Sequence, residues 1–308
     1  MKALSFAGIW VLLKDSFAGF SQDKLPKLGG SLAYFTIFSL GPMILVIIFL
    51  AGLFLGRNAV EGSLYGQIQQ LVGADAALQL QQLIRSASAS KGGITAAIIG
   101  GVVLLIGATS IFSEIQDSIN TIWRLELKPN RSWLHMLVSR LLAFGLIATM
   151  GFLLLVSLAA SAIIEGLGAR LRDLLPGITV SLFYLASQAL TLLLATALFA
   201  FIFKILPAAI LRWHDVWPGA LATALLFMIG RFGISFYISK SDFGNTYGAA
   251  GSLVILLVWV YYSALILYFG AEFTRAYTTR FGSGIRPRSY AYSTAGKDTP
   301  YDKEGAEK

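Results

Sequence analysis

The chain of 308 residues contains no cysteine and only two histidines, His135 and His214. Without cysteine there are no disulfide bonds and there is no thiol chemistry. Neither histidine lies in an HExxH or HxHxDH pattern, so the sequence offers no ligand set for a catalytic metal. A GxSxG motif is absent as well. We therefore expect a protein that is not an enzyme and that needs no metal and no other cofactor.

Charged residues are also scarce, since they make up 13% of the chain, whereas hydrophobic residues make up 56% and the mean hydropathy is +0.72. A soluble domain has about 25% charged residues, so this composition predicts a membrane protein. The net charge is +8, but the basic residues are scattered between apolar stretches and concentrated in one tail. That distribution argues against a nucleic-acid partner and favours membrane lipids.

Six apolar stretches are long enough to cross a bilayer, which takes about 20 residues. They cover 29–56, 92–113, 141–164, 177–203, 217–238 and 247–271. Lys and Arg residues number 17 in the segments on the side of the two termini and six in the opposite connections. Because cytoplasmic segments carry the excess of positive charge, both termini are predicted to be cytoplasmic. The expected fold is an all-α membrane protein with six transmembrane helices.

The segments outside the spans differ in character. Residues 1–28 carry an apolar stripe at helical spacing, which predicts an interfacial amphipathic helix followed by a linker. A signal peptide cleaved near Ser16-Phe17-Ala18 is the alternative for this segment. Within the transmembrane domain, 29–281, residues 57–91 are expected to form a periplasmic helical loop. The tail, 282–308, is rich in Gly, Ser and charge, and is predicted to be disordered.

Two features inside the spans suggest a substrate path. Gly41 and Pro42 interrupt the first span, and a broken helix at membrane depth needs protein or a water-filled cavity around it. A simple packing kink is the alternative. Burying the charge of Arg231 inside a span costs free energy. Its side chain is expected either to contact an anionic group in a cavity or to extend to the outer surface of the membrane. Tyr184 and Gln188 are polar candidates in the fourth span.

The second span has one face almost bare of side chains, which predicts close packing with another helix or with a second copy of the chain. The small residues of this face are Gly93, Ala97, Gly100, Gly101 and Gly107.

Beyond Ser113 the same helix is expected to continue with a polar face at the cytoplasmic boundary. This face carries Glu114, Asp117, Thr121 and Arg124. We expect its carboxylates to contact a loop arginine or a partner, because no histidine or phosphate cradle beside them supports acid–base catalysis. Glu272, after the last span, is either a solvated helix end or the partner of Arg275 or of a loop arginine.

Four segments resemble the YihY/BrkB family of bacterial inner-membrane proteins, over roughly residues 5 to 280. They are GGSLAYFTIFSLGPM in the first span, GATSIFSEIQDSINTIW after the second, WHDVWPGALATALLF entering the fifth and YGAAGSLVILLVWVYYSALILYFGAEFTRAY in the sixth. The resemblance implies six spans, cytoplasmic termini, an inner-membrane location and an association with virulence, but no agreed catalytic residues. The family's old ribonuclease BN label is not carried over, because the metal-ligand pattern is missing.

The function expected from these features is transport or flipping of a lipid or another amphiphilic envelope component. The alternative is a non-transporting scaffold that recruits an envelope-biogenesis protein, and an enzyme comes third. Either of the first two functions is compatible with a homo-oligomer or an envelope protein partner.

Overall fold

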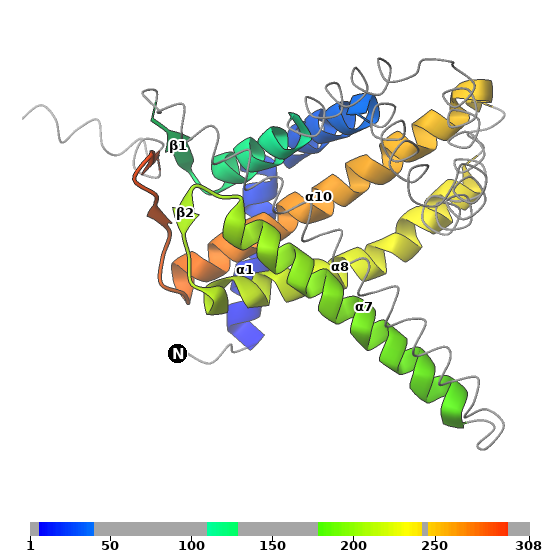
Figure 1. Cartoon of the computed structure of the whole chain (residues 1–308), viewed down its shortest axis with the longest axis horizontal. Helices are drawn as coiled ribbons and strands as arrows, with labels where there is room; N and C mark the ends of the chain where they lie inside the picture. Colours follow the sequence, from blue (N-terminus) through cyan, green and yellow to red (C-terminus); the bar gives the residue numbers. More distant parts are fainter. Residues whose placement is uncertain (1–5, 40–109, 129–177, 242–245, 295–308) are drawn as a thin grey trace, which may run out of the picture. The chain divides into compact units, whose positions relative to one another are not determined.

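The protein is described by a computed structural model that covers residues 6–39, 110–128, 178–241 and 246–294. Helices dominate these residues, as the composition predicts. Residues 25–39 and 110–122 are helical, and the other elements, labelled as in Figure 1, are α1 (Phe6–Gln22), β1 (Leu125–Leu127), α7 (Ile178–Ile205), β2 (Ala209–Ile210), α8 (Trp213–Lys240), a 3₁₀ turn (Gly248–Ala250), α10 (Gly251–Arg280), β3 (Arg286–Pro287) and β4 (Ala291–Ser293).

Three of the described helices are long and apolar enough to cross a membrane. Their apolar parts are Gln188–Ile205, Trp213–Ile238 and Leu253–Arg280, which correspond to the predicted fourth, fifth and sixth spans. Residues 29–39 are the described part of the predicted first span. Most of the second span and all of the third lie outside the described residues. The last helix continues nine residues past the predicted end at Ala271, because no glycine or proline interrupts it before Gly282.

The chain divides into two compact units. One consists of 1–24, 116–229 and 266–308, and the other of 25–115 and 230–265. Both α8 and α10 contribute residues to each unit. In the second unit the helix 25–39 packs against α10, where Gly29 faces the side chains of Tyr261 and Leu265. All contacts of the candidate site described below lie in the first unit.

In the first unit α8 and α10 pack closely through a reciprocal pair of glycines and threonines. A Cβ atom at Gly219 would overlap the side chain of Thr274, and one at Gly270 would overlap that of Thr223. Each threonine hydroxyl donates to the carbonyl oxygen four residues earlier in its own helix, at 2.7 Å. The contact therefore brings two backbones together without leaving these hydroxyls unpaired, as small residues do between membrane helices.

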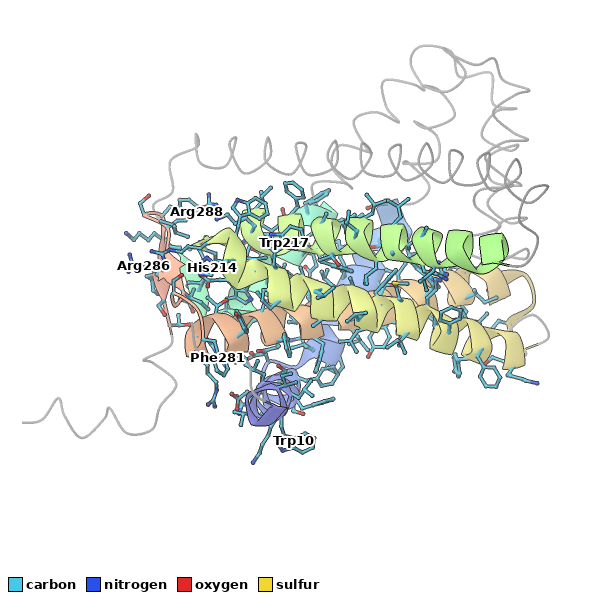
Figure 2. The ribbon with its side chains drawn as sticks, turned by 90° about the horizontal axis from the view of Figure 1, so that it is seen from below. Trp10, His214, Trp217, Phe281, Arg286 and Arg288 are labelled. Carbon is cyan, nitrogen blue, oxygen red and sulfur yellow. The ribbon has the colours of Figure 1, made fainter. Side chains whose placement is uncertain are left out.

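The C-terminal segment 282–294 is ordered, so the prediction of a disordered tail is wrong for these residues. β4 pairs antiparallel with β1, and β3 pairs antiparallel with β2. The Ser283 hydroxyl also donates to the buried carboxylate of Asp215 in the first turn of α8. Figure 2 shows Arg286 and Arg288 close to His214, at the start of the same helix. Composition alone does not reveal this order, because the pairing partners are connections far away in the sequence. Residues 295–308 lie outside the described part.

Candidate functional site

Two helix ends build the site, and both use a non-glycine residue with a left-handed backbone. α1 is followed by Lys24 with φ 51°, and the helix 110–122 is followed by Arg124 with φ 57°. A residue in this conformation reverses the chain at the end of a helix and is uncommon when it is not glycine. The two turns bring the carboxylate of Asp23 to the guanidinium of Arg124, with 2.8 Å between Oδ1 and Nη2.

A second arginine, Arg275 of α10, joins this pair into a four-residue ionic cluster. Its Nη1 lies 3.5 Å from Asp23 Oδ2, and its Nε lies 3.2 Å from Glu272 Oε2. The same Nη1 donates a hydrogen bond of 2.7 Å to the carbonyl oxygen of Ile122, near the end of the helix 110–122. Arg275 therefore connects the ends of two helices to α10. We name Asp23, Arg124, Glu272 and Arg275 the ionic cluster.

Exposure within the ionic cluster is uneven. The side chains of Asp23 and Glu272 are 2% and 1% exposed, whereas those of Arg124 and Arg275 are 29% and 21% exposed. The carboxylates thus form the inner layer and the guanidinium groups form the outer layer. Because an unpaired buried carboxylate is very costly, the two arginines stabilise the acids from the water-facing side.

Glu272 is held in place by the helices around it as well as by its ion pair. A Cβ atom at Gly19 of α1 would lie 2.5 Å from the carboxyl carbon of Glu272. The carbonyl oxygen of Ala271, the residue before Glu272, accepts a 3.0 Å hydrogen bond from the buried indole Nε1 of Trp123. Gly19 is therefore needed because α1 packs directly on the carboxyl group.

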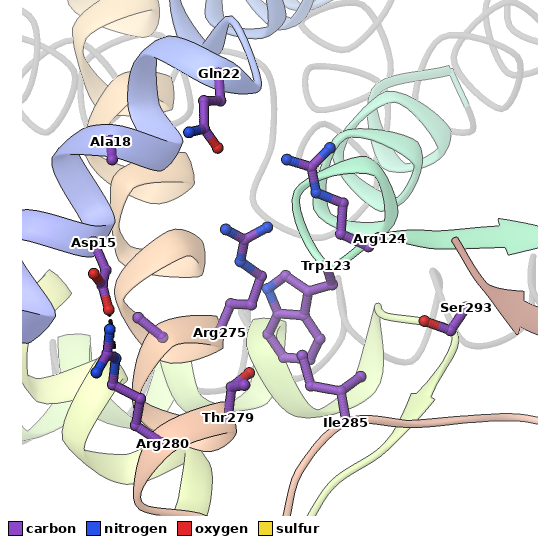
Figure 3. A pocket seen from close by; sticks show the side chains of 11 residues that line it. Asp15, Ala18, Gln22, Trp123, Arg124, Arg275, Thr279, Arg280, Ile285 and Ser293 are labelled. Carbon is purple, nitrogen blue, oxygen red and sulfur yellow. Dashed lines mark hydrogen bonds and ion pairs between the residues drawn. The ribbon is translucent and has the colours of Figure 1, made fainter. Parts of the chain in front are cut away.

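A cavity of about 560 Å³ opens on the outer side of the ionic cluster (Figure 3). Three guanidinium groups and one carboxylate line it, so cationic groups predominate on its wall, and the buried carboxylates of Asp23 and Glu272 lie behind Arg124 and Arg275. An ion pair of 2.5 Å between Arg280 and Asp15 joins α10 to α1 here. The lining residues are Asp15, Ala18, Gln22, Trp123, Arg124, Arg275, Ala276, Thr279, Arg280, Ile285 and Ser293.

The chemistry of this cavity favours an anionic group. A guanidinium offers several N–H donors in a fixed plane, which suits the oxygen atoms of a phosphate or a carboxylate. Gln22, Thr279 and Ser293 add polar side chains that hydrogen-bond oxygen atoms. Within the described ranges no three acidic or histidine side chains form a group that fits a metal ion.

The structure brings together only some of the residues that the sequence singled out. Glu272 and Arg124 both belong to the ionic cluster, and Glu272 pairs with Arg275, so its interpretation as a solvated helix end is wrong. Asp117 and Thr121 are exposed instead, with the Thr121 hydroxyl donating to the carbonyl oxygen of Asp117. Glu114, on the same helix, is half-buried.

Two candidates for a substrate path inside the spans, Arg231 and Gln188, are not among the residues that line the cavity. Arg231 is exposed in the second unit, with its guanidinium carbon 5.6 Å from the centre of the Phe232 ring. Gln188 is half-buried in α7, which also contains the backbone of Tyr184. The remaining candidates lie outside the described residues: Gly41, Pro42, Gly93, Ala97, Gly100, Gly101 and Gly107.

Asp23 is a site residue that was not predicted from the sequence, and neither were two amides of the helix 110–122, the buried Asn120 and the half-buried Gln116. The Asn120 side-chain oxygen accepts a 2.8 Å hydrogen bond from the backbone N–H of Ala208, and Gln116 Nε2 donates one of 2.8 Å to the carbonyl oxygen of Leu206. Their four-residue spacing was the available signal, because it places both amides on one helical face.

These features define a helical membrane protein that carries buried charge at the ends of its helices. The chain belongs to the family described as Virulence factor BrkB, whose model matches residues 16–293. This family membership confirms the resemblance drawn from the sequence.

The curated relatives are similar over most of this chain. A UPF0761 membrane protein of Tolumonas auensis is 28% identical, over 82% of this chain and 80% of its own length. One from Vibrio cholerae serotype O1 (strain M66-2) is 30% identical, over 84% of each chain. One from Ralstonia nicotianae is 27% identical, over 81% of this chain but only 55% of its own length. These names state a membrane protein and no activity. No solved structure gives a significant match.

Proposed function

We propose that this protein is a bacterial inner-membrane transporter, flippase-like in action, for an amphiphile with an anionic headgroup. The observation that carries the proposal is the cavity, in which Arg124, Arg275 and Arg280 face a single carboxylate, Asp15. Such a wall attracts a phosphate group, which carries about −1 to −2 charges near pH 7. The 17-to-six distribution of Lys and Arg supports a cytoplasmic location for this end of α10.

The helix that forms one wall of the cavity supports an amphiphilic ligand. Asp15, Ala18 and Gln22 of α1 line the cavity, while Trp10 and Phe17 on the same helix are 68% and 63% exposed. Trp10 points outward from α1 in Figure 2. Exposed aromatic side chains are typical of a helix at the membrane–water interface. α1 would thus present apolar side chains to the lipid and a polar side to the headgroup.

A flux assay in liposomes tests the proposal. Purified protein is reconstituted with fluorescent phosphatidylglycerol or phosphatidylcholine, and the transfer of each lipid between leaflets is followed by bleaching of the outer leaflet. We expect protein-dependent transfer of the anionic lipid that exceeds transfer of the zwitterionic one. An absence of protein-dependent transfer for every lipid would refute the proposal.

The variant Arg280→Gln tests the cavity itself, because it removes one guanidinium while the ionic cluster keeps its charges. Arg280 is half-exposed, so the expected loss of interaction is only about 1 kcal/mol, which corresponds to roughly fivefold slower transfer at low lipid fraction. Arg212→Gln is the matched control, since Arg212 is exposed and is not a lining residue. Equal effects of the two substitutions would show that the cavity does not recognise the anion.

A further inference from the structure

The inner layer of the ionic cluster contains two carboxyl groups that share the guanidinium of Arg275, which lies 3.5 Å from Asp23 Oδ2 and 3.2 Å from Glu272 Oε2. Glu272 lies within hydrogen-bonding reach of Asp23, and both side chains are almost fully buried. Two carboxylates this close repel each other, and their burial leaves little solvent to screen the repulsion. A proton between the two oxygen atoms converts this repulsion into a hydrogen bond, as it does in aspartic proteases.

The hydrogen-bond donors around the two carboxyl groups are too few to pair all of their oxygen atoms. Asp23 Oδ1 forms an ion pair with Arg124. Arg275 lies 3.5 Å from Asp23 Oδ2 and 3.2 Å from Glu272 Oε2. Nevertheless, Asp23 Oδ2 and both oxygen atoms of Glu272 accept no hydrogen bond from the residues that the structure describes. Gly19 packs against the carboxyl group and closes this side. Buried oxygen atoms without a donor are rare in native proteins, and a proton on one of these carboxyl groups supplies the donor.

We propose that Asp23 and Glu272 form a proton-binding site, in which one proton taken from solution is bonded to one carboxyl oxygen and hydrogen-bonded to the other. One O–H bond forms when the site loads, and the same bond breaks when the proton returns to water. The charged groups that act on the pair are Arg124, from the turn after the helix 110–122, and Arg275 of α10. α8 faces this part of α10 through the uncharged residues Thr223 and Gly219.

Loading the site changes the charge of the ionic cluster. With the proton, the two acids carry one negative charge together against two guanidinium groups, which leaves one positive charge. Without the proton the cluster is neutral. If the proposed function is right, the proton therefore strengthens the attraction of the cavity for an anion, and raising the pH weakens it.

Infrared spectroscopy of the full-length protein in detergent tests proton binding directly, because a protonated carboxyl group has a C=O stretch that a carboxylate lacks. We expect this band in the wild type at neutral pH, lost reversibly as the pH rises. Glu272→Gln should abolish the band and keep the fold, since glutamine has the same shape and its N–H can donate to Asp23. In Asp23→Asn, any band that remains should disappear at a lower pH than in the wild type, because the negative charge beside Glu272 is gone.

Asp117→Asn is the control, because Asp117 is exposed on the helix 110–122 and lies outside the ionic cluster. It should leave the band unchanged. The absence of a protonated-carboxyl band from the wild type at neutral pH would overturn the proposal, and that measurement needs no variant to fold. A band that persists in folded Glu272→Gln would also overturn it.

The same experiment separates this proposal from the proposed function. A band that behaves as expected in a protein that transfers no lipid establishes the proton site and refutes the transporter. A missing band in a protein that transfers the anionic lipid does the reverse. The pH dependence of transfer then reports the link between the two, since transfer should slow as the band is lost and should lose this dependence in Glu272→Gln.

Discussion

The substitution Gly19→Ala probes how closely α1 packs on Glu272. The new Cβ atom would lie 2.5 Å from the carboxyl carbon of Glu272 and 2.6 Å from each of its oxygen atoms. Moving the carboxyl group away would loosen its contact with Arg275, whose Nε lies 3.2 Å from Glu272 Oε2. Overpacking of this kind costs about 1–3 kcal/mol.

A matched glycine separates the clash from the general effect of alanine on a helix. Gly30 is also helical, but nothing lies within 4 Å of the Cβ position there. Gly30→Ala should therefore gain about 1 kcal/mol from helix propensity alone, and Gly19→Ala gains the same amount before the clash is counted. The difference in free energy of unfolding between the two variants should be about 1–3 kcal/mol.

Unfolding in mixed micelles with an increasing fraction of sodium dodecyl sulfate, followed by tryptophan fluorescence, measures this difference. Equal stability of Gly19→Ala and Gly30→Ala would refute the close contact. Glu272→Ala provides a further check, because it removes the carboxyl group that the new methyl meets. In a double-mutant cycle, Gly19→Ala should cost less in the Glu272→Ala background than in the wild type.

Two further predictions concern the connections around the site. Asn120→Ala should lower the free energy of unfolding by about 1–3 kcal/mol, because the N–H of Ala208 loses its buried acceptor. The exposed control Thr121→Ala should change it by less than about 0.5 kcal/mol. Equal effects of the two substitutions in the same unfolding assay would contradict this prediction. The hydrogen bond to Glu126 raises the pKa of Tyr292, so Glu126→Gln should lower that pKa, and an unchanged titration of ¹³C-labelled tyrosine by NMR would contradict it. Because the bond favours the protonated phenol, its stabilising effect is present below the ordinary pKa of tyrosine and is lost as the pH rises through the raised value.

The apolar helices followed from the sequence because the membrane acts on each segment separately. A run of about 20 apolar residues buries its own backbone hydrogen bonds as a helix wherever it stands in the chain. The predicted spans 177–203 and 217–238 match α7 and α8 within a few residues. The helix α1 was also predictable, because its apolar stripe has helical spacing.

The ionic cluster did not follow from the sequence in the same way. Asp23 and Glu272 are almost 250 positions apart, and each stands among residues that fit an ordinary helix end. The sequence left open whether Glu272 is solvated or paired with Arg275, and only the packing of α1 against α10 removes the water. The ordered segment 282–294 has the same origin, since its strands depend on β1 and β2.

Apolar length and family motifs are local properties, so the sequence was enough to predict a helical membrane protein of the BrkB family. The tertiary structure decided which charges are buried together, which glycines allow helices to touch, and where a cationic cavity lies. These properties depend on distances between side chains from different helices. Coulombic interactions and desolvation change steeply with such distances, and a linear sequence does not specify them.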